Sequence, residues 1–552
     1  MSLISHDRRS REVVPGKTIF DYADELAVEV PTSCKRAGRC HECVVEVEEG
    51  MASLRPRGEA ESFLRGNYRL ACQAVILRDD LDIAFSPLRR RPKILAAGRR
   101  RPAVELDPAV SRRGEAIFYE NEAVDRFRGH VLGLALDLGT TTLVMDLVDL
   151  GSGRVLMTAS CENPQRFGGS DVMHRISYDG EHSGELQRAA VAAINREIEA
   201  LCRSLGCSRR AIYEVAVAGN STMRDIFFKL DVQPIGQRPY KSAVEHDWRA
   251  GRRPTTALLE NAPRLGLKVN PKARVYGLPL IASHVGGDMA ADLIAAGLAF
   301  GCAETAMLVD IGTNTEVAIV RGGRMIVASC PAGPAFEGGL VKYGVPGQDG
   351  AIESLRLSAD GRCLDYRTIG EVEPQGLCGS GLIDLLAELR RHGLMTAKGV
   401  FTADRRRFAM TILPEHGITF SREDASHLAQ AKAANYCGQL IVMRAFGAEP
   451  GDIKRLYLAG GFANYIDVAN AIAIGFLPPI PEERIVKIGN AAVEGARQVL
   501  LSRRLRRALE ERVKSVEHIE LETTPDFFEV FVEGCRLEPM PASFRPAAAL
   551  AS

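Results

Sequence analysis

The chain has 552 residues, and its 70 Lys and Arg residues balance its 70 Asp and Glu residues. This neutral balance gives no global attraction to nucleic acid, and the length predicts about three or four domains. The longest uncharged apolar stretch, residues 293–303, is too short to cross a bilayer, and the N-terminus is polar. We therefore expect a cytoplasmic protein with no nucleic acid and no membrane partner. Its thirteen cysteines should be metal ligands or buried thiols rather than disulfides.

Four cysteines near the N-terminus follow the spacing C-x5-C-x2-C-x28-C. Three thiolates from one loop and a fourth from a distant turn suit an iron–sulfur cluster, and Gly38 lets the loop wrap closely around it. A structural zinc site is the alternative, but such sites prefer two C-x2-C pairs, and this segment has one. The predicted metal ligands are Cys34, Cys40, Cys43 and Cys72.

Residues 87–128 have the composition of a linker. Nine Lys and Arg residues stand against two acidic residues between Pro87 and Arg113, and four prolines disfavour regular structure. We expect a tether, with a short helix over residues 114–128. The tether is either a solvated spacer or a docking segment for an acidic partner. The arginines that would dock are Arg89, Arg90, Arg91, Arg99, Arg100 and Arg101.

Two stretches share one pattern: an apolar strand, a polar turn and a second apolar strand. The first is LGLALDLGTTTLVMDLVD over residues 132–149, and the second is MLVDIGTNTEVAIVR over residues 307–321. Glycine and hydroxyl residues in such turns let backbone N–H groups approach a phosphate chain. Asp137 and Asp310 end the first strands, where a carboxylate can hold a hard cation through water. The repeat predicts two related halves that face one nucleotide across a cleft.

Two further glycine turns fit the same cleft. The strand RLYLA runs into a Gly-Gly turn at residues 460–461, and residues 376–384 open a helix whose first N–H groups make an anion site. The alternative is a set of unrelated glycine turns after buried strands. Asp137 and Asp310 are the predicted catalytic residues. The predicted nucleotide-binding residues are Gly139, Thr140, Thr141, Thr142, Gly312, Thr313, Asn314, Gly379, Ser380, Gly381, Gly460, Gly461 and Phe462.

Other segments allow local predictions. Residues 184–204 carry an apolar stripe typical of a helix, and residues 490–511 are Ala- and Leu-rich and also predict a helix. The tail over residues 516–541 contains two strand-like stretches, HIELET and FEVFVEG. The loop over residues 161–176 is too polar for a core, so we expect it to face the cleft or a partner.

A few single residues fit two interpretations each. Asp288 follows a Gly-Gly pair before a helix and suits either an N-cap or a phosphate or metal contact. In the sequence VAVAGNSTMR, the polar turn either contacts the cleft or caps a helix through Ser221 or Thr222. Cys330 and Cys378 are isolated, so we expect small buried residues there rather than ligands.

Taken together, these loops resemble the reductive activators of corrinoid proteins, whose members join a ferredoxin module to an ASKHA-type ATPase. The one-residue-longer first cysteine gap is similar to that of adrenodoxin-like ferredoxins. Arg36 departs from the resemblance, because a glycine is usual there in the cluster loop. The motifs that carry the resemblance are CxxxGxCxxC, DLGTTT, NPQxxxGxDVxxRI, GNSTM, DIGTNTE, ASCPAGPAFEGG, GLCGSGLID and AGGFANYID.

The resemblance implies a multidomain α/β protein. Residues 1–86 would form a β-grasp 2Fe-2S ferredoxin-like domain, and residues 87–128 the linker. Residues 129–296 and 297–552 would form duplicated ATPase domains of the actin, Hsp70 and acetate-kinase type, with an RNase H-like fold. The implied cofactors are a 2Fe-2S cluster, ATP and Mg²⁺.

The implied activity is ATP-dependent transfer of one electron to an inactive Co(II) corrinoid protein, which restores Co(I) for methyl transfer. The implied partners are a corrinoid (cobalamin-binding) protein of a methyltransferase system and a low-potential electron donor, and we allow for a homodimer. A small-molecule kinase of the acetate and sugar kinase superfamily, with a regulatory Fe-S domain, is the alternative. A third candidate is an activator of a 2-hydroxyacyl-CoA dehydratase, but that family lacks a ferredoxin domain and bridges one cluster between subunits.

Overall fold

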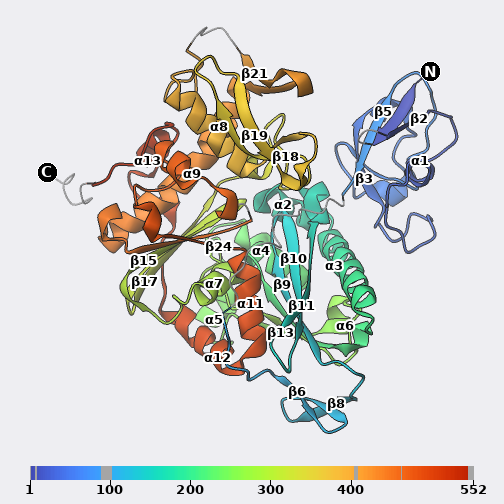
Figure 1. Ribbon diagram of the computed structural model, residues 1–552. Helices are drawn as coiled ribbons and strands as arrows, with labels where there is room; N and C mark the ends of the chain where they lie inside the picture. Colours follow the sequence, from blue (N-terminus) through green and yellow to red (C-terminus); the bar gives the residue numbers. More distant parts are fainter. Residues whose placement is uncertain (1, 7–8, 89–101, 403–407, 462, 545–552) are drawn as a thin grey trace.

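The computed structural model describes residues 2–6, 9–88, 102–402, 408–461 and 463–544. Figure 1 shows an N-terminal domain beside a larger body that is built around two sheets. Phe462 and the six arginines predicted to dock the tether lie outside the described residues.

The N-terminal domain is a five-stranded mixed sheet in the order β2-β1-β5-β3-β4, with β1 and β5 parallel. Helix α1 (Ile19–Glu25) begins at a capping box between Thr18 and Asp21 and buries Ile19, Phe20 and Tyr22. This arrangement is the one expected for a β-grasp domain. The strands are β1 (Leu3–His6), β2 (Arg9–Glu12), β3 (Val44–Glu49), β4 (Tyr68–Leu70) and β5 (Ile83–Pro87).

The predicted helix over residues 114–128 is wrong. The segment folds into a three-stranded sheet of β6 (Val110–Arg113), β7 (Ala116–Tyr119) and β8 (Glu122–Arg126). Gly114 and Glu120 have φ values of +63° and +52°, so both connections turn where a helix would have to continue. The residues just before this sheet bind the body, because the Asp107 N–H donates to the Leu501 carbonyl. The tether is therefore shorter than predicted.

The first lobe is a six-stranded sheet in the order β11-β10-β9-β12-β14-β13. Its central strands β9, β12 and β14 are parallel, and β9, β10 and β11 form an antiparallel meander. The strands are β9 (Leu132–Leu138), β10 (Thr142–Asp149), β11 (Val155–Glu162), β12 (Ile212–Ala218), β13 (Leu258–Asn261) and β14 (Arg274–Gly277). The helices are α2 (Val172–Glu181), α3 (Glu185–Leu205), α4 (Ser221–Phe227), α5 (Ala243–Arg249), α6 (Ala262–Leu265) and α7 (Gly287–Ala295), and α3 confirms the predicted helix.

The second lobe repeats this topology in the order β24-β23-β15-β16-β17-β25, again with an antiparallel meander and parallel strands beside it. The duplication read from the two hairpins is thus a duplication of whole sheets. The strands are β15 (Cys302–Ile311), β16 (Asn314–Gly322), β17 (Arg324–Pro331), β23 (Arg455–Ala459), β24 (Ile485–Gly489) and β25 (Glu517–His518).

A smaller layer of strands and helices covers the upper part of the second lobe in Figure 1. Its strands are β18 (Ala351–Leu357), β19 (Cys363–Thr368), β20 (Gly376–Leu377), β21 (Ala409–Leu413) and β22 (Ile418–Ser421). The helices in this layer and next to it are α8 (Gly379–Arg391), α9 (Arg422–Phe446) and α10 (Val468–Ala473). Cys330 and Cys378 are buried, as predicted.

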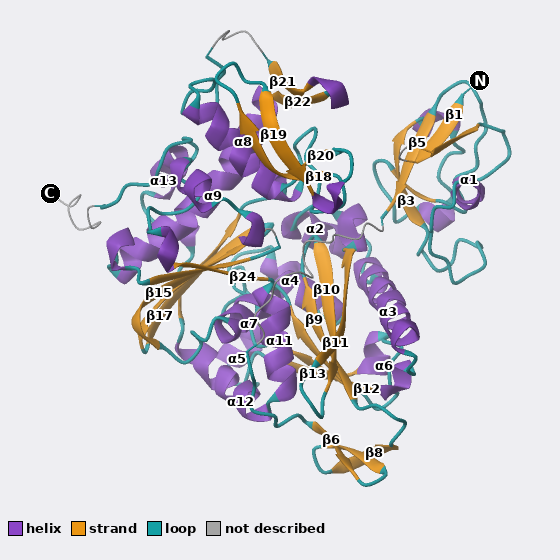
Figure 2. Ribbon diagram, viewed as in Figure 1, coloured by secondary structure: helices purple, strands orange, loops and turns teal. Residues whose placement is uncertain are grey.

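Two helices separate the sheets, α7 and α11 (Ala491–Leu501), which Figure 2 shows between the two sets of strands. The core there joins Ala135 of the first sheet, Leu308 of the second and Val493 of α11. The predicted helix over residues 490–511 breaks at Ser502, whose side chain caps a second helix, α12 (Arg503–Arg512). The chain predicted as the C-terminal domain therefore returns to pack on the first lobe.

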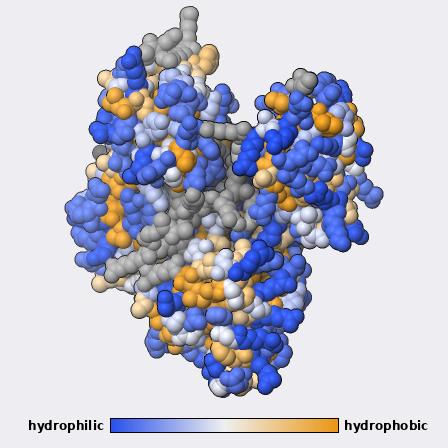
Figure 3. Space-filling view, turned by 45° about the vertical axis from the view of Figure 1, so that its right-hand side comes forward, coloured by the Kyte–Doolittle hydropathy of each residue, from blue (hydrophilic) through white to orange (hydrophobic). Residues whose placement is uncertain are grey.

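The tail contains one short strand, β25, and the stretch FEVFVEG is a helix, α13 (Phe527–Gly534). Its strand prediction is wrong because Val530 and Gly534, four residues apart, both pack inward against α9. On the face shown in Figure 3, hydrophilic residues predominate and hydrophobic ones form small separate areas. Across the described ranges, we find no helix that is both long and apolar enough to span a membrane.

Candidate functional site

The four predicted cysteine ligands lie in one loop and in the turn after β4. The Sγ atoms of Cys43 and Cys72 are 3.4 Å apart, far beyond the disulfide length of about 2.0 Å. Cys34 and Cys40 share a contact with the hydroxyl of Thr32, at 4.0 and 3.9 Å. All four are free thiols. Two pairs of thiols fit a 2Fe-2S centre, in which four thiolates serve two irons.

The loop lowers the pKa of two of the four thiols, whereas the hydrogen bond to Cys72 and burial raise the pKa of Cys43. Burial opposes ionisation of Cys34, but backbone N–H groups of Ala37, Arg39 and Cys40 and the Cys40 thiol lower the pKa of its thiol to about 6. The hydrogen bond from Cys43 lowers the pKa of Cys72 to about 6. The Gln73 amide also donates to Cys72 Sγ, at 3.3 Å. Gly38 has φ +69°, and a Cβ there would lie 3.0 Å from the Gln73 side chain, so this loop requires glycine.

The thiol loop rests directly on the first lobe, because His41 stands between two of the ligands and reaches α3. Its Nδ1 lies 2.9 Å from Glu185 Oε2 and 3.1 Å from the Arg188 guanidinium. Its ring stacks on Phe63 with centroids 4.1 Å apart, and Tyr178 of α2 donates its hydroxyl to the Phe63 carbonyl at 2.5 Å. The N-terminal domain accordingly lies beside α2 and α3 in Figure 1.

A second set of contacts involves the short helical turn over residues 164–168, which belongs to the polar loop predicted to face the cleft or a partner. Arg166 pairs with Glu46 of β3, and the Phe167 ring meets the Phe63 ring edge-on with centroids 5.9 Å apart. Arg65 also pairs with Glu181 at the end of α2. The tether is therefore not the only connection between the two parts of the chain.

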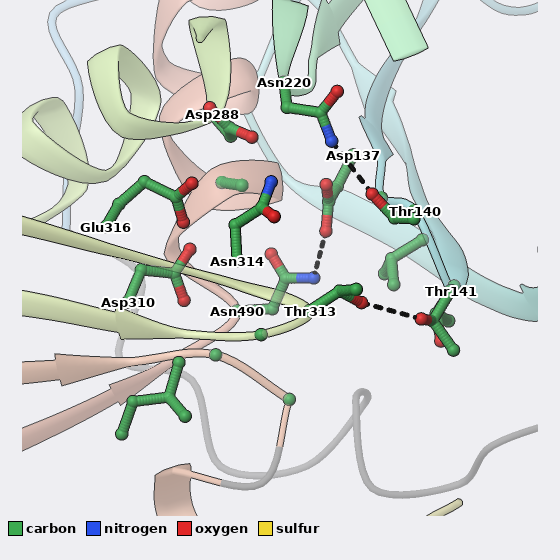
Figure 4. Close-up of a pocket in the computed structure, with 18 of the residues that line it drawn as sticks. Asp137, Thr140, Thr141, Asn220, Asp288, Asp310, Thr313, Asn314, Glu316 and Asn490 are labelled. Carbon is green, nitrogen blue, oxygen red and sulfur yellow. Dashed lines mark hydrogen bonds between the residues drawn. The ribbon is translucent and has the colours of Figure 1, made fainter. Parts of the chain in front are cut away.

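The two polar turns meet tip to tip across the cleft, as the repeat predicts (Figure 4). The hydroxyls of Thr141 and Thr313 lie 2.9 Å apart, and both donate to Oε2 of Glu337. Asn220 donates to the Thr140 hydroxyl at 2.9 Å, and Asn490 donates to Asp137 Oδ2 at 2.6 Å. A cavity of about 120 Å³ lies between the two turns.

The two hairpins are related but differ in length by one residue. In the first, Leu138 pairs with Leu143, so four residues form the turn; in the second, Ile311 pairs with Thr315, so three do. Aligned from their aspartates, Thr313 corresponds to Thr140. The shorter second turn instead brings Thr313 against Thr141, while Thr140 is held by Asn220.

The far side of the cavity is lined with carboxylates, at Asp137, Asp288, Asp310 and Glu316. Burial raises the pKa of Asp310 and raises that of Asp288 to about 7. Asp292 lies fully buried beside Asp310, and burial raises its pKa as well. Among the residues described here, no three His, Cys, Asp or Glu side chains converge closely enough to hold one ion directly. A cation here would be held through water and a bound phosphate.

Most predicted nucleotide residues line this cavity: both polar turns, Gly460 and Gly461, together with the two aspartates predicted to be catalytic. Gly379, Ser380 and Gly381 do not line it. The Ser380 hydroxyl donates to the Glu353 carbonyl at 2.7 Å, and a Cβ on Gly381 would lie 2.2 Å from the Ile352 carbonyl. This glycine-rich run packs the start of α8 closely against β18.

The structure also decides between interpretations that the sequence left open. Asn220, rather than Ser221 or Thr222, caps α4, and the same side chain holds the first turn, so that loop both caps and contacts. Gly286 is the N-cap of α7, and Asp288 lines the cavity instead. Capping by Asp288 is therefore wrong.

The sequence analysis missed three residues that line the cleft, for a different reason in each case. Asn490 is 353 residues from Asp137 and also caps α11. Glu337 sits in a Gly- and Pro-rich loop that gave no sign of a cleft contact. Glu316 is the cross-strand partner of Asp310, a position that could have been read from the hairpin by counting back from the turn.

Three models of known protein families match this chain. Residues 4–77 match the family model "2Fe-2S iron-sulfur cluster binding domain", residues 132–300 match "RACo middle region", and residues 304–547 match "C-terminal domain of RACo the ASKHA domain". The "Corrinoid activation enzyme RamQ" of Eubacterium limosum is 28% identical, over 93% of this chain and 95% of its own.

Two further proteins, one of them of solved structure, are also similar to this chain. The "[Co(II) methylated amine-specific corrinoid protein] reductase" of Methanosarcina barkeri is 24% identical, over 72% of this chain and 75% of its own. A solved structure titled "Reductive activator for corrinoid,iron-sulfur protein" superposes with a TM-score of 0.71 at 28% identity, over 98% of this chain and 99% of its own.

The fold and the two sites define an iron–sulfur protein in which a 2Fe-2S ferredoxin-like domain is fused to an ASKHA-type body. Within that class, the chain belongs to the family of reductive activators of corrinoid proteins.

Proposed function

We propose that this protein is an ATP-dependent reductive activator, which returns one electron to an inactive Co(II) corrinoid protein and so restores Co(I) for methyl transfer. The observation that carries the proposal is that one chain holds a four-thiol loop and a two-sided cleft, with the loop docked on the first lobe of the cleft through His41 and Glu185. The named relatives, which include a corrinoid activation enzyme and a Co(II) corrinoid protein reductase, support it.

At the thiol loop, Cys34, Cys40, Cys43 and Cys72 would hold the 2Fe-2S cluster, which supplies one-electron chemistry when bound. The residues of this loop would hold the thiolates and adjust the reduction potential of the cluster. Its backbone N–H groups and the Gln73 amide point at the sulfurs, and such hydrogen bonds help to set the reduction potential.

At the cleft, the two polar turns would grip the phosphates of ATP, with Gly460 and Gly461 against the adenosine. Asp137 and Asp310 would hold Mg²⁺ through water and orient the attacking water. Asn490 fixes the carboxylate of Asp137, so this side chain is aimed before any ligand arrives. The surrounding carboxylates favour a divalent cation, because its charge relieves their mutual repulsion.

ATP is required because the transfer of the electron from the cluster to Co(II) is thermodynamically unfavourable. Reducing Co(II) to Co(I) needs a very low potential, whereas plant-type clusters lie near about −400 mV. Each shortfall of about 59 mV costs a tenfold factor in the equilibrium of a one-electron step. ATP can make the step one-way if the protein binds its corrinoid partner differently in its two nucleotide states. The upstream donor must therefore be a low-potential electron carrier.

The test combines the anaerobically purified protein with a Co(II) corrinoid protein, Mg²⁺, ATP and a low-potential reductant. We expect the Co(I) absorbance to appear only when ATP is present, and phosphate release to rise when the corrinoid protein is added. Asp310→Asn should remove nearly all hydrolysis and leave the cluster spectrum intact, because the two sites are in different domains. Equal Co(I) formation without nucleotide would refute the coupling, and a phosphorylated small molecule would assign the kinase class instead.

A further inference from the structure

Glu337 holds the tips of the two polar turns together. Its Oε2 accepts hydrogen bonds from Thr141 of the first lobe, at 2.8 Å, and from Thr313 of the second. Its Oε1 lies over Gly312, 3.9 Å from where a Cβ on that glycine would stand. One carboxylate thus occupies the face of the second turn and spans both lobes.

The position of this carboxylate is the one where an anion is expected. The two hydroxyls that it accepts from belong to the turns proposed to grip phosphate, and glycine clears the same space for a close approach. With the tips joined, the cavity is about 120 Å³, well below the roughly 300 Å³ at which small-molecule pockets begin. While Glu337 stays in place, it occupies the two hydroxyl donors that a phosphate would need.

We propose that Glu337 is a positioning residue that substitutes for the terminal phosphate of ATP, joining the two turns and withdrawing when that phosphate binds. The proposal rests on the proposed ATP site. Two anions cannot share the same two hydroxyl donors, so the bound phosphate must either displace the carboxylate or meet it protonated.

The local backbone allows the withdrawal. Glu337 ends a single helical turn (Ala335–Glu337) and is followed by Gly338, whose φ of +89° few other residues adopt. Two residues later Leu340 has φ +65° and a side chain that is 62% exposed. The carboxylate is therefore carried by a strained loop with solvent on its outer side.

Charge also favours displacement. Burial raises the pKa of Glu337 above its usual value, and this exceeds the opposing effect of the hydrogen bonds from Thr313 and Thr141. The carboxylate of Asp310 raises this pKa further, while Arg175 of α2 lowers it. The other charged groups that line the same cavity are all acidic: Asp137, Asp288 and Glu316. An ionised Glu337 should thus compete with phosphate at high pH, and a protonated one should compete less.

The test measures binding of a non-hydrolysable ATP analogue and of ADP, each with Mg²⁺, by titration calorimetry at pH 6 and pH 8. Glu337→Gln should bind the ATP analogue about tenfold more tightly than wild type at pH 8 and only slightly more tightly at pH 6. ADP affinity should change much less, because ADP lacks the phosphate that replaces the carboxylate. Differences between variant and wild type are compared, because the nucleotide itself titrates.

Glu388→Gln is the matched control, since this buried carboxylate of the same lobe lies outside the cavity lining. It should leave both affinities unchanged. The proposal is overturned if Glu337→Gln binds the ATP analogue no more tightly than wild type. It is also overturned if that variant loses hydrolysis at unchanged affinity, because Glu337 would then act on the attacking water. Absence of ATP binding by wild type would instead overturn the proposed function itself.

Discussion

The Nδ1 atom of His41 lies 2.9 Å from Oε2 of Glu185, a residue 144 positions later in the chain. His41 stands between two cluster ligands, and Glu185 opens the longest helix of the first lobe. The thiol loop is therefore oriented by the aromatic contacts of Phe63 and by polar pairs that are partly exposed. Individually, such partly exposed pairs contribute only about 0.2–1 kcal/mol, so the domains can part when conditions change.

The first prediction concerns this docking. Glu185→Lys should place a cation against Arg188 and His41 and release the N-terminal domain, which increases the radius of gyration measured by small-angle X-ray scattering. The effect should grow as the ionic strength of the buffer falls, because the new repulsion is then less screened. Glu199→Lys is the control, because Glu199 lies on the same helix and pairs with Arg203 in solvent. Identical scattering from both variants would contradict the docking.

The second prediction concerns the potential of the thiol loop. Gln73 donates to Cys72 Sγ at 3.3 Å, and a donor to sulfur stabilises the more negative, reduced state. Gln73→Met keeps the bulk of the side chain but loses the donor, so the reduction potential should fall by roughly tens of millivolts. A spectroelectrochemical titration measures this potential, with Gln430→Met, at an exposed position of α9, as the unchanged control. An unaltered potential in Gln73→Met would mean that this bond does not tune the cluster.

Function could be predicted from the sequence where the residues that carry it lie close together in the chain. The cysteine spacing and the two DxGT turns are short, so their chemistry is visible without knowing the fold. Contacts between distant segments were not visible, because nothing near Asp137 indicates that Asn490 will hold it. The single-residue difference between the two turns was also hidden, since it depends on how the strands pair.

The wrong secondary-structure predictions have physical reasons. FEVFVEG has strong β propensity, but packing of Val530 and Gly534 on α9 selects a helix. The fully buried ammonium of Lys432 then donates to the carbonyls of Gly534 and Arg536 and satisfies the end of that helix. Neither partner could be identified from the local pattern.

The third prediction concerns pH. Burial raises the pKa of Asp288 from 3.8 to about 7, so between these values the folded protein keeps a proton that the unfolded chain has lost. The contribution of this group to stability is therefore greatest below about pH 4 and declines as pH rises to about 7. Without Mg²⁺, the Tm should fall over this range, and Asp288→Asn should reduce that fall by roughly a few degrees.

Calorimetry of wild type and variant in parallel isolates this contribution from other titrating groups. Mg²⁺ should raise the Tm of wild type most at high pH, where the carboxylates are ionised. Asp360→Asn serves as the control, because that exposed carboxyl has a lowered pKa. If Asp288→Asn and wild type lose stability in parallel across the range, the raised pKa of Asp288 is wrong.

One short segment connects the cleft to the thiol domain. The Asn163 N–H donates to the Thr141 carbonyl at 2.7 Å, and its side-chain amide donates to the Gly139 carbonyl at 2.8 Å. The ring of Phe167, four residues after Asn163, packs edge-on against the ring of Phe63 in the N-terminal domain. A change in the first turn can therefore reach the N-terminal domain through residues 163–167, without passing along the tether.

The last prediction tests this connection. Phe167→Leu keeps an apolar side chain but loses the edge-on ring contact, which is worth about 0.5–1.5 kcal/mol. In wild type we expect a non-hydrolysable ATP analogue to change the radius of gyration, because the first turn must rearrange around phosphate and draws Asn163 with it. That response should shrink in Phe167→Leu, while basal ATP hydrolysis stays within about twofold, since Phe167 does not line the cavity. Phe300→Leu, at a phenylalanine that is 55% exposed, should keep the full response. A full response in Phe167→Leu would instead direct attention to α2, whose Tyr178 and Glu181 contact the same domain.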